Sequence, residues 1–581
     1  MNSNTEQHFG HTPQIDLKRS KFDLSHSNKT TFNCSDLIPV YVDTDILPGD
    51  TVQLDMAELV RMMTPIYPIM DNLFMDIYAF FTPHRLVWDN WQAFWGENDD
   101  PWTQQTEYEV PYIEAPEGGW TEGTIADYMG IPTKVEGIQP NALAFRAYCK
   151  VWNDWFRDEN LKKCCHIYTD ETNRQGLNGT EEDYDYVTGA ELGGKPLKVA
   201  KFHDYYTSCL PQPQKGEPVT IPMGTTANVT TPTGTYAAVD TRTGENFTSG
   251  AHNTVKFRYL TQEGSIAPLS HSSNGKVMGL KIPGYSGYGE LTQITNTTAT
   301  YETGFNGYIP TNLVTDTTNL YADLSEATRV TINQLRTAFA IQKYYENAGL
   351  HGTRYIEYLR GVFGVTSSDA RLQRAEYLGG QRVPINIDQI LQTSATNEVS
   401  PQGNTSGFSC TINRDSMFTK SFEEHGTLMV LVCIRTDHTY QQGLEKMWTR
   451  RKWTDFYNPF FANLGEDAVL NENIYAQGTD DDKEAFGYQE RWAEYRYKNN
   501  RVSGYMRSNA TGSLDVWHFA DDYDSLPHLS SEWIDETTSN VDRTIAVTSA
   551  LNHQFLGDFY FKMSYTRAMP VYSIPGLIDH V

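Results

Sequence analysis

One apolar run stands out in this chain: Gly426-Thr-Leu-Met-Val-Leu-Val-Cys-Ile-Arg435. Its length and its β-branched residues are typical of a strand buried on both faces. Residues 559–566 instead alternate apolar and polar side chains, which predicts a half-buried strand. A third β-prone run, rich in aromatic residues, covers 73–81. Because strands recur in both halves of the chain, we predict a mainly β fold: an eight-stranded antiparallel jelly roll whose first and last elements pair, with long loop insertions and several helices.

Two longer helices are predicted between these strands. After Pro140, apolar residues recur at three- and four-residue intervals over 143–155, which predicts a helix whose aromatic face covers a sheet. A second helix is expected over 324–347, opened by the pattern that begins at Asp323 and stopped by Gly349.

Two shorter helical pieces are also predicted. One lies around 56–63, among strand signals. The other lies over 85–94, where Leu86, Trp91 and Trp95 share a helical face. Both would connect or flank strands rather than form a layer of their own.

Composition divides the chain into four parts. Residues 1–35 are polar and predict an N-terminal arm, and 36–216 hold the first part of the β domain with helical insertions. Residues 217–320 are rich in Thr, Gly, Asn and Pro and contain neither Trp nor Cys, which predicts a surface insertion of short strands and exposed loops. Residues 321–581 complete the domain and end in a C-terminal arm.

Overall composition excludes several classes of protein. Hydrophobic residues make up 39% of the 581 residues, which is ample core material. The formal net charge of −27 argues against a generally basic nucleic-acid binder. No apolar run is long enough to span a membrane, and the first residues lack the features of a signal peptide. We therefore expect a chain that is made and kept in the cytosol, without membrane insertion.

The cysteines give no metal or disulfide framework. Their number, seven, is odd and no C-x-x-C pair occurs, which predicts reduced and mostly buried thiols. The run Cys164-Cys165-His166 is compatible with a metal or redox site, but adjacent cysteines bridge only with strain and no fourth ligand is evident. We expect no metal and no cofactor.

Motifs of enzymes are weak. Gly284-Tyr-Ser-Gly-Tyr-Gly289 lacks the glycine spacing of a nucleophile elbow or a dinucleotide loop and is better explained as a glycine-rich turn. Asp480-Asp-Asp-Lys483 and Asp521-Asp-Tyr-Asp524 could bind a divalent cation, but neither has the spaced ligands of a calcium loop, and solvated acidic turns are the usual outcome. We predict no catalytic residues.

Two basic clusters are candidate contacts for nucleic acid. One contains Lys18, Arg19 and Lys21, and the other contains Arg450, Arg451, Lys452 and Trp453, followed by further aromatic residues. Cations attract phosphates and aromatic rings stack on unpaired bases, which is how proteins hold single strands without reading sequence. Two alternatives remain open: Arg450 and Arg451 could form salt bridges to the acidic body or to a neighbouring subunit, and the first cluster could belong to an arm without DNA contact.

Two further segments are suited to contacts between subunits. Residues 486–498 place aromatic rings among carboxylates and cations, the composition that dominates binding energy at protein interfaces. Residues 569–581 contain two prolines, which favour an extended arm lying on another surface. The candidate contact residues are Tyr488, Arg491, Trp492, Tyr495, Arg496, Tyr497, Tyr572 and Pro575.

Short motifs spread over most of the chain carry a family resemblance, and only about 217–320 lack one. The motifs are Ile38-Pro-Val-Tyr-Val-Asp43, Leu47-Pro-Gly-Asp50, Leu86-Val-Trp-Asp-Asn-Trp91, Gly352-Thr-Arg-Tyr355, Asp369-Ala-Arg-Leu-Gln-Arg374, Glu376-Tyr-Leu-Gly-Gly380 and Thr439-Tyr-Gln-Gln-Gly-Leu444.

With these motifs and the segments 486–498 and 569–581, the chain resembles the major capsid proteins of microviruses, small icosahedral single-stranded-DNA bacteriophages, of the gokushovirus type. The resemblance implies a viral jelly roll, a T=1 shell of about sixty copies around circular single-stranded DNA, and a virion protein assembled in the bacterial cytoplasm. It also implies three partners: an internal scaffolding protein, a small basic DNA-binding protein and a minor pilot protein. The insertion would form a threefold protrusion that contacts a host receptor, with Tyr285 and Tyr288 as candidate contact residues.

Two other classes of protein share some of these features. A secreted carbohydrate-binding or glycoside-processing β-sandwich protein would suit the many Trp and Tyr residues, but no signal peptide and no pair of catalytic carboxylates is evident. A tail or fibre protein is disfavoured because the chain has no internal repeats.

Overall fold

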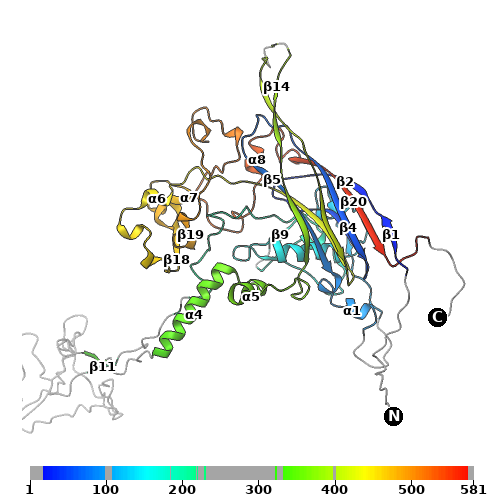
Figure 1. Cartoon of the computed structure of the whole chain (residues 1–581), viewed down its shortest axis with the longest axis horizontal. Helices are drawn as coiled ribbons and strands as arrows, with labels where there is room; N and C mark the ends of the chain where they lie inside the picture. The colour runs from blue at the N-terminus through cyan, green and yellow to red at the C-terminus, as the bar shows by residue number, and fades with distance from the viewer. Residues whose placement is uncertain are drawn as a thin grey trace, which may run out of the picture. The chain divides into compact units, whose positions relative to one another are not determined.

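The computed structural model describes residues 18–97, 107–182, 185–217, 219, 228–230, 321–323, 332–394, 396 and 401–572 (Figure 1). The chain divides into two compact units, one formed by Met1–Val219 with Ala340–Val581 and the other by Thr220–Phe339. In the second unit, strands β11 (Asn228–Thr230) and β12 (Tyr321–Asp323) form an antiparallel pair. The rest of the insertion expected over 217–320 lies outside the described residues, apart from its first residues, and so do Tyr285 and Tyr288.

The first unit is built on two antiparallel sheets. In the first sheet, β20 pairs with β4 on one side and with both β1 and β2 on the other, and β4 pairs with β16. The second sheet has the order β13-β5-β17-β3. These strands are β1 (Ser20–Asp23), β2 (His26–Phe32), β3 (Ile38–Ile46), β4 (Thr51–Met62), β5 (Leu73–Pro83), β13 (Glu376–Pro384), β16 (Thr411–Ser421), β17 (Gly426–Thr436) and β20 (Phe555–Arg567).

The predicted strands and their pairing are confirmed where the sequence pattern was strongest. Strand β17 is buried along almost its whole length, and β20 alternates buried and accessible side chains. The first described strands pair with the last one, as expected from strand signals at both ends of the chain. The expected N-terminal arm over 1–35 is therefore not wholly an arm, because its residues 20–32 belong to the first sheet.

The helix predicted at 56–63 is wrong. Residues 56–62 belong to β4, in which every second side chain from Val52 to Met62 is buried. The pattern has the period of two that marks a strand facing a core on one side. Together with the inner faces of β20, β3, β5 and β17, this face forms the core between the two sheets, which includes Leu54, Phe559 and Phe561.

The outer face of the second sheet is covered by a helix. Phe80, Leu431 and Cys433 pack against a second cluster that contains α3 (Leu143–Val151), which continues as a π-helix over Trp152–Phe156. The hydroxyl of Tyr148 donates to the carbonyl of Leu37 at 2.8 Å, tying the helix to the sheet. The prediction of an aromatic helix that covers a sheet is confirmed.

Two other predicted helices differ from the structure, and residues 324–331, the expected start of the helix over 324–347, lie outside the described residues. Helix α4 (Ile332–His351) passes through Gly349 and ends before Gly352, whose φ of +86° is a left-handed conformation that glycine adopts without strain. Residues 85–94 form two short pieces, a 3-10 turn over His84–Leu86 and α1 (Trp91–Phe94), rather than one helix.

A third apolar cluster lies in the same unit and includes Tyr206, Ile474, Phe486 and Trp533.

No described helix combines the length and apolar character needed to cross a membrane. The remaining elements are β6 (Ile113–Glu114), α2 (Ile125–Tyr128), β7 (Cys164–Cys165), β8 (Arg174–Gln175), β9 (Glu181–Glu182), β10 (Tyr186–Thr188), α5 (Tyr355–Phe363), β14 (Ile387–Leu391), β15 (Thr405–Ser409), α6 (Lys446–Thr449), β18 (Glu466–Leu470), α7 (Asn471–Ile474), β19 (Ala485–Glu490) and α8 (Ser539–Asp542).

Candidate assembly surface

Residues 446–464 hold a group of aromatic side chains out in solvent. The loop is fixed by two side-chain caps: the Asp455 carboxylate accepts the backbone N–H groups of Arg451 and Lys452 at 2.9 and 2.8 Å, and the Asn458 side chain accepts that of Phe460 at 3.0 Å. The two bonds from Lys452 and Arg451 lower the pKa of Asp455. The group, called here the aromatic surface, consists of Trp448, Trp453, Phe456, Tyr457 and Phe460.

The exposure of these rings is unusual for side chains of their size. Trp453 is 70% exposed and Phe460 is 92% exposed. Single exposed apolar residues are common, but several large ones on one short loop are typical of an interaction site. Since ordered caps hold the loop in place, the exposed rings belong to its defined conformation.

The structure joins the two sites that the sequence predicted separately. The guanidinium of Arg450 pairs with Glu494 at 2.9 Å and lies 4.2 Å from the ring centre of Tyr495. The backbone N–H of Tyr457 donates to the Tyr495 hydroxyl at 3.2 Å. The candidate DNA contacts at 450–453 and the candidate subunit contacts at 495–497 therefore share one surface.

The cationic side chains on this surface differ in whether they form ion pairs. Arg450 is neutralised by Glu494, as in the salt-bridge alternative, and both side chains are largely buried. Arg496 pairs with Glu490 at 2.8 Å. Arg451 and Lys452 are exposed and form no ion pair within the described chain. The surface thus offers two cations beside exposed rings on a protein whose formal net charge is −27.

Several predicted subunit-contact residues instead make contacts within the chain. Trp492 is only 6% exposed, and its indole N–H donates to the carbonyl of Phe461 at 2.9 Å, so little of its ring is available to a neighbour. Tyr488 is half-buried and pairs its backbone with Leu210. Arg491 is half-buried beside the ring of Trp492.

The remaining candidates are spread over the chain. Tyr495, Arg496 and Tyr497 are exposed, as is Tyr572, whereas Pro575 lies outside the described residues. The other basic cluster is also accessible: Lys18, Arg19 and Lys21 are all exposed, and Lys21 lies on β1.

The acidic runs do not gather ligands for a metal. Lys483 pairs with Asp480 at 2.7 Å, and Asp482 accepts backbone N–H groups from Gln477 and Gly478. Within the described ranges no cluster of His, Cys, Asp or Glu has an arrangement suited to a metal ion. All seven cysteines are free thiols, five of them buried.

Asp521 overturns the expectation of a solvated acidic turn. It is buried and accepts a hydrogen bond from His438 Nδ1 at 2.8 Å, while His438 Nε2 donates to Glu536 at 3.0 Å. Burial alone would lower the pKa of His438, but the two carboxylates outweigh it and raise the pKa to about 10. Asn540 donates to Asp521, and Thr436 donates to Glu536, each at 2.8 Å. The cluster is a buried cation held between two anions, and no local motif in the sequence signals it.

A two-sheet body with an exposed aromatic surface is typical of a subunit that takes part in a larger assembly. Comparison with known proteins agrees. Residues 11–577 match the family described as capsid protein (F protein). Capsid protein VP1 of Spiroplasma virus 4 is 42% identical over 568 residues, covering 97% of this chain and 96% of that protein. Capsid protein VP1 of Bdellovibrio phage phiMH2K is 39% identical and that of Chlamydia phage 1 is 37% identical, with at least 97% of each chain covered.

The chain belongs to this family of phage capsid proteins. It is a structural protein of the virion, a major capsid protein of the microvirus type, and its copies assemble into an oligomeric shell. The resemblance found in the sequence is confirmed. The alternatives of a carbohydrate-active sandwich and of a tail or fibre protein are not supported.

Proposed function

We propose that about sixty copies of this chain close into a T=1 icosahedral shell around circular single-stranded DNA. The two sheets would act as an eight-stranded jelly roll, in which β1 and β2 count as one interrupted strand because they pair with successive parts of β20. Closed symmetry follows when contacts between copies complete rings instead of continuing indefinitely. Assembly would take place in the host cytoplasm, with the scaffolding, basic and pilot proteins as partners.

The DNA contact is assigned to the aromatic surface. The observation that carries this assignment is the exposure of Trp453 and Phe460 on the same loop as Arg451 and Lys452, which form no ion pair within the described chain. Bases stack on such rings and phosphates attract such cations, with little preference for sequence. Lys18, Arg19 and Lys21 would add a second, more peripheral contact.

A contact between copies is the second candidate for the same surface. It is favoured because Arg450 is already neutralised by Glu494 and because exposed Tyr495, Arg496 and Tyr497 adjoin the rings. Trp, Tyr and Arg residues dominate the energy of protein interfaces. The surface insertion, with Tyr285 and Tyr288, remains the proposed contact with the host.

One double variant separates the two candidates. The double variant Trp453→Ala, Phe460→Ala removes two exposed rings. Leu551→Ala serves as the control, because Leu551 is an apolar side chain that is 79% exposed and lies outside the aromatic surface. If the rings stack on DNA, closed shells form but contain less nucleic acid, measured by their absorbance ratio at 260 and 280 nm. If the rings join copies, the variant subunits stay unassembled. Shells with normal DNA content would contradict both assignments.

A further inference from the structure

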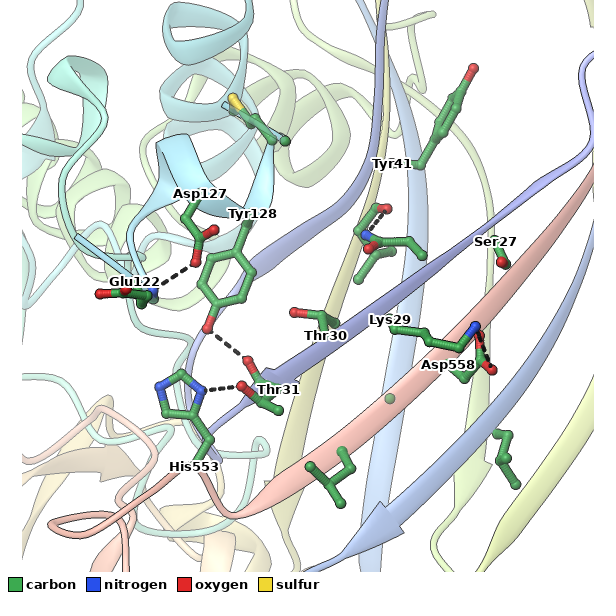
Figure 2. A pocket seen from close by; sticks show the side chains of 18 of the residues that line it. Ser27, Lys29, Thr30, Thr31, Tyr41, Glu122, Asp127, Tyr128, His553 and Asp558 are labelled. Carbon is green, nitrogen blue, oxygen red and sulfur yellow. Dashed lines mark hydrogen bonds and ion pairs between the residues drawn. The ribbon is translucent and has the colours of Figure 1, made fainter. Parts of the chain in front are cut away.

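A pocket of about 790 Å³ lies between β2, β3, β20 and the turn of α2 (Figure 2). Figure 2 shows Tyr128 and His553 beside Thr31, each joined to it by a dashed line, at one end of the pocket. The Tyr128 hydroxyl donates to the carbonyl of Thr31 at 2.9 Å, and His553 Nδ1 lies 2.8 Å from the Thr31 hydroxyl. These bonds close that end, and β2 forms one wall of the remainder.

The wall formed by β2 is an open strand edge. In an antiparallel pair, the backbone N–H and C=O groups of every second residue point toward the partner strand. The backbone N–H of Leu24 donates to the carbonyl of Met563 at 3.0 Å, so the even-numbered residues His26, Asn28 and Thr30 also direct their backbone groups toward β20. On the β4 side of β20, the backbone N–H of Met63 donates to the carbonyl of Gln554 at 2.8 Å. Even-numbered residues of β20 therefore bond to β4 and odd-numbered ones to β2, which agrees with this assignment.

The groups of Ser27 and Lys29 therefore point away from the sheet and toward the pocket side of β2. The carbonyl of Thr31, with the same parity, indeed accepts from Tyr128 rather than from β20. Within the part of the chain that the structure describes, the backbone N–H and C=O groups of Ser27 and Lys29 have no hydrogen-bond partner. Both residues are exposed, so a molecule from outside can reach them.

The charged groups around the pocket are mostly satisfied already. Lys29 pairs with Asp558 at 3.2 Å, Glu122 pairs with Lys134, and Asp127 accepts the backbone N–H of Gly123 at 2.9 Å. A strongly charged ligand such as a phosphate would meet carboxylates as well as cations. What remains unpaired is the alternating row of backbone donors and acceptors, and an extended polypeptide presents the complementary row.

We propose that an extended segment of a second copy of this chain adds a strand to the outer edge of β2 in the assembled shell. Open edges attract further strands, so proteins cover them or block them with proline or charge. Strand β2 contains no proline and only one lysine. Because the chain belongs to a family of shell-forming proteins, other copies surround each subunit at high local concentration. The inference rests on the proposed shell.

A proline variant tests the outer edge without disturbing the sheet. The N–H group of Ser27 does not bond to β20, so Ser27→Pro removes only an outward donor, and proline is tolerated on such an edge. We expect the Ser27→Pro subunit to unfold at the same temperature as the wild type. The concentration at which it forms shells should be higher by a factor of about five or more. Ser27→Ala keeps the N–H group and should assemble as the wild type does, whereas Asn28→Pro should destabilise the subunit. Normal assembly of Ser27→Pro would overturn the proposal.

Amide hydrogen exchange gives an independent readout on the wild-type chain. The Ser27 and Lys29 amides should exchange fast in the free subunit and at least about tenfold more slowly in shells made from this chain alone. The Asn28 and Thr30 amides should be protected in both states. Shells in which Ser27 and Lys29 still exchange fast would refute the inference and leave the shell intact as a finding. Protection that requires another viral protein would exclude a second copy as the occupant, and failure to form any shell even with the scaffolding partner supplied would count against the proposed function.

Discussion

The buried cation at His438 gives the sharpest prediction about stability. His438→Gln replaces the imidazolium with a neutral side chain of similar reach and leaves Asp521 and Glu536 without a counter-charge. Removing one partner of a buried ion pair costs about 3–5 kcal/mol. The rise in the pKa of His438 from 6.5 to about 10 gives a similar figure, about 5 kcal/mol.

The cost of the variant must depend on pH in a defined direction. Because the folded chain raises the pKa of His438, its contribution is fully present below about pH 6.5 and is lost as the pH rises toward 10. The slope is about 1.4 kcal/mol per pH unit between these limits. The variant should therefore be about 3–5 kcal/mol less stable than the wild type at pH 6 and only about 1–2 kcal/mol less stable at pH 9.

Chemical denaturation of the free subunit at pH 6 and pH 9 measures both differences. His203→Gln, which changes an exposed histidine, controls for the loss of a titrating group. A difference between variant and wild type that is equal at the two pH values would refute the ion-pair reasoning. A variant as stable as the wild type at pH 6 would do the same.

Three further predictions follow from burial and charge. Arg450→Ala should lower the free energy of unfolding by about 3 kcal/mol because it leaves Glu494 unpaired. Lys452→Ala, at an exposed residue, should change it by less than about 0.5 kcal/mol. Equal effects of the two variants in chemical denaturation would contradict the buried ion pair between Arg450 and Glu494. Burial raises the pKa of Glu191 to about 7, so its charge destabilises the fold as the pH rises above 4.5, and Glu191→Gln should raise the melting temperature at pH 8 but not at pH 4.5. In the core, Leu54→Ala should cost about 2–5 kcal/mol, while Ile412→Ala, 73% exposed on β16, should cost less than about 0.5 kcal/mol in the same denaturation assay.

Strong local patterns carried the fold prediction. The apolar run of β17, the alternation in β20 and the aromatic periodicity of α3 each specify one element without help from the rest of the chain. The helix predicted at 56–63 fails because the buried carboxylate of Glu58 interrupts the apolar alternation of β4. Glu58 is held inside by hydrogen bonds from Asn413 and Gln381, at 2.6 and 3.0 Å, which lie on other strands and cannot be foreseen from the segment itself.

The candidate site was only partly predictable for the same reason. Composition indicated that 450–453 and 495–497 are contact residues, but only the folded chain brings them onto one surface and shows that Arg450 is already paired. Trp492 has the composition of an interface residue yet packs beneath Tyr457 and donates to Phe461. The partners of His438 lie 83 and 98 residues away along the chain, so no spacing rule could join them.

The proposed function requires about sixty copies of this chain to close into one shell. The most direct measurement is the mass of particles formed when the chain is produced with its scaffolding partner and then purified, by native mass spectrometry with negative-stain electron microscopy. Sixty chains of 66.0 kDa predict closed particles of about 4 MDa before DNA is added. A chain that stays monomeric under assembly conditions, or that grows into open filaments or sheets, would contradict the account.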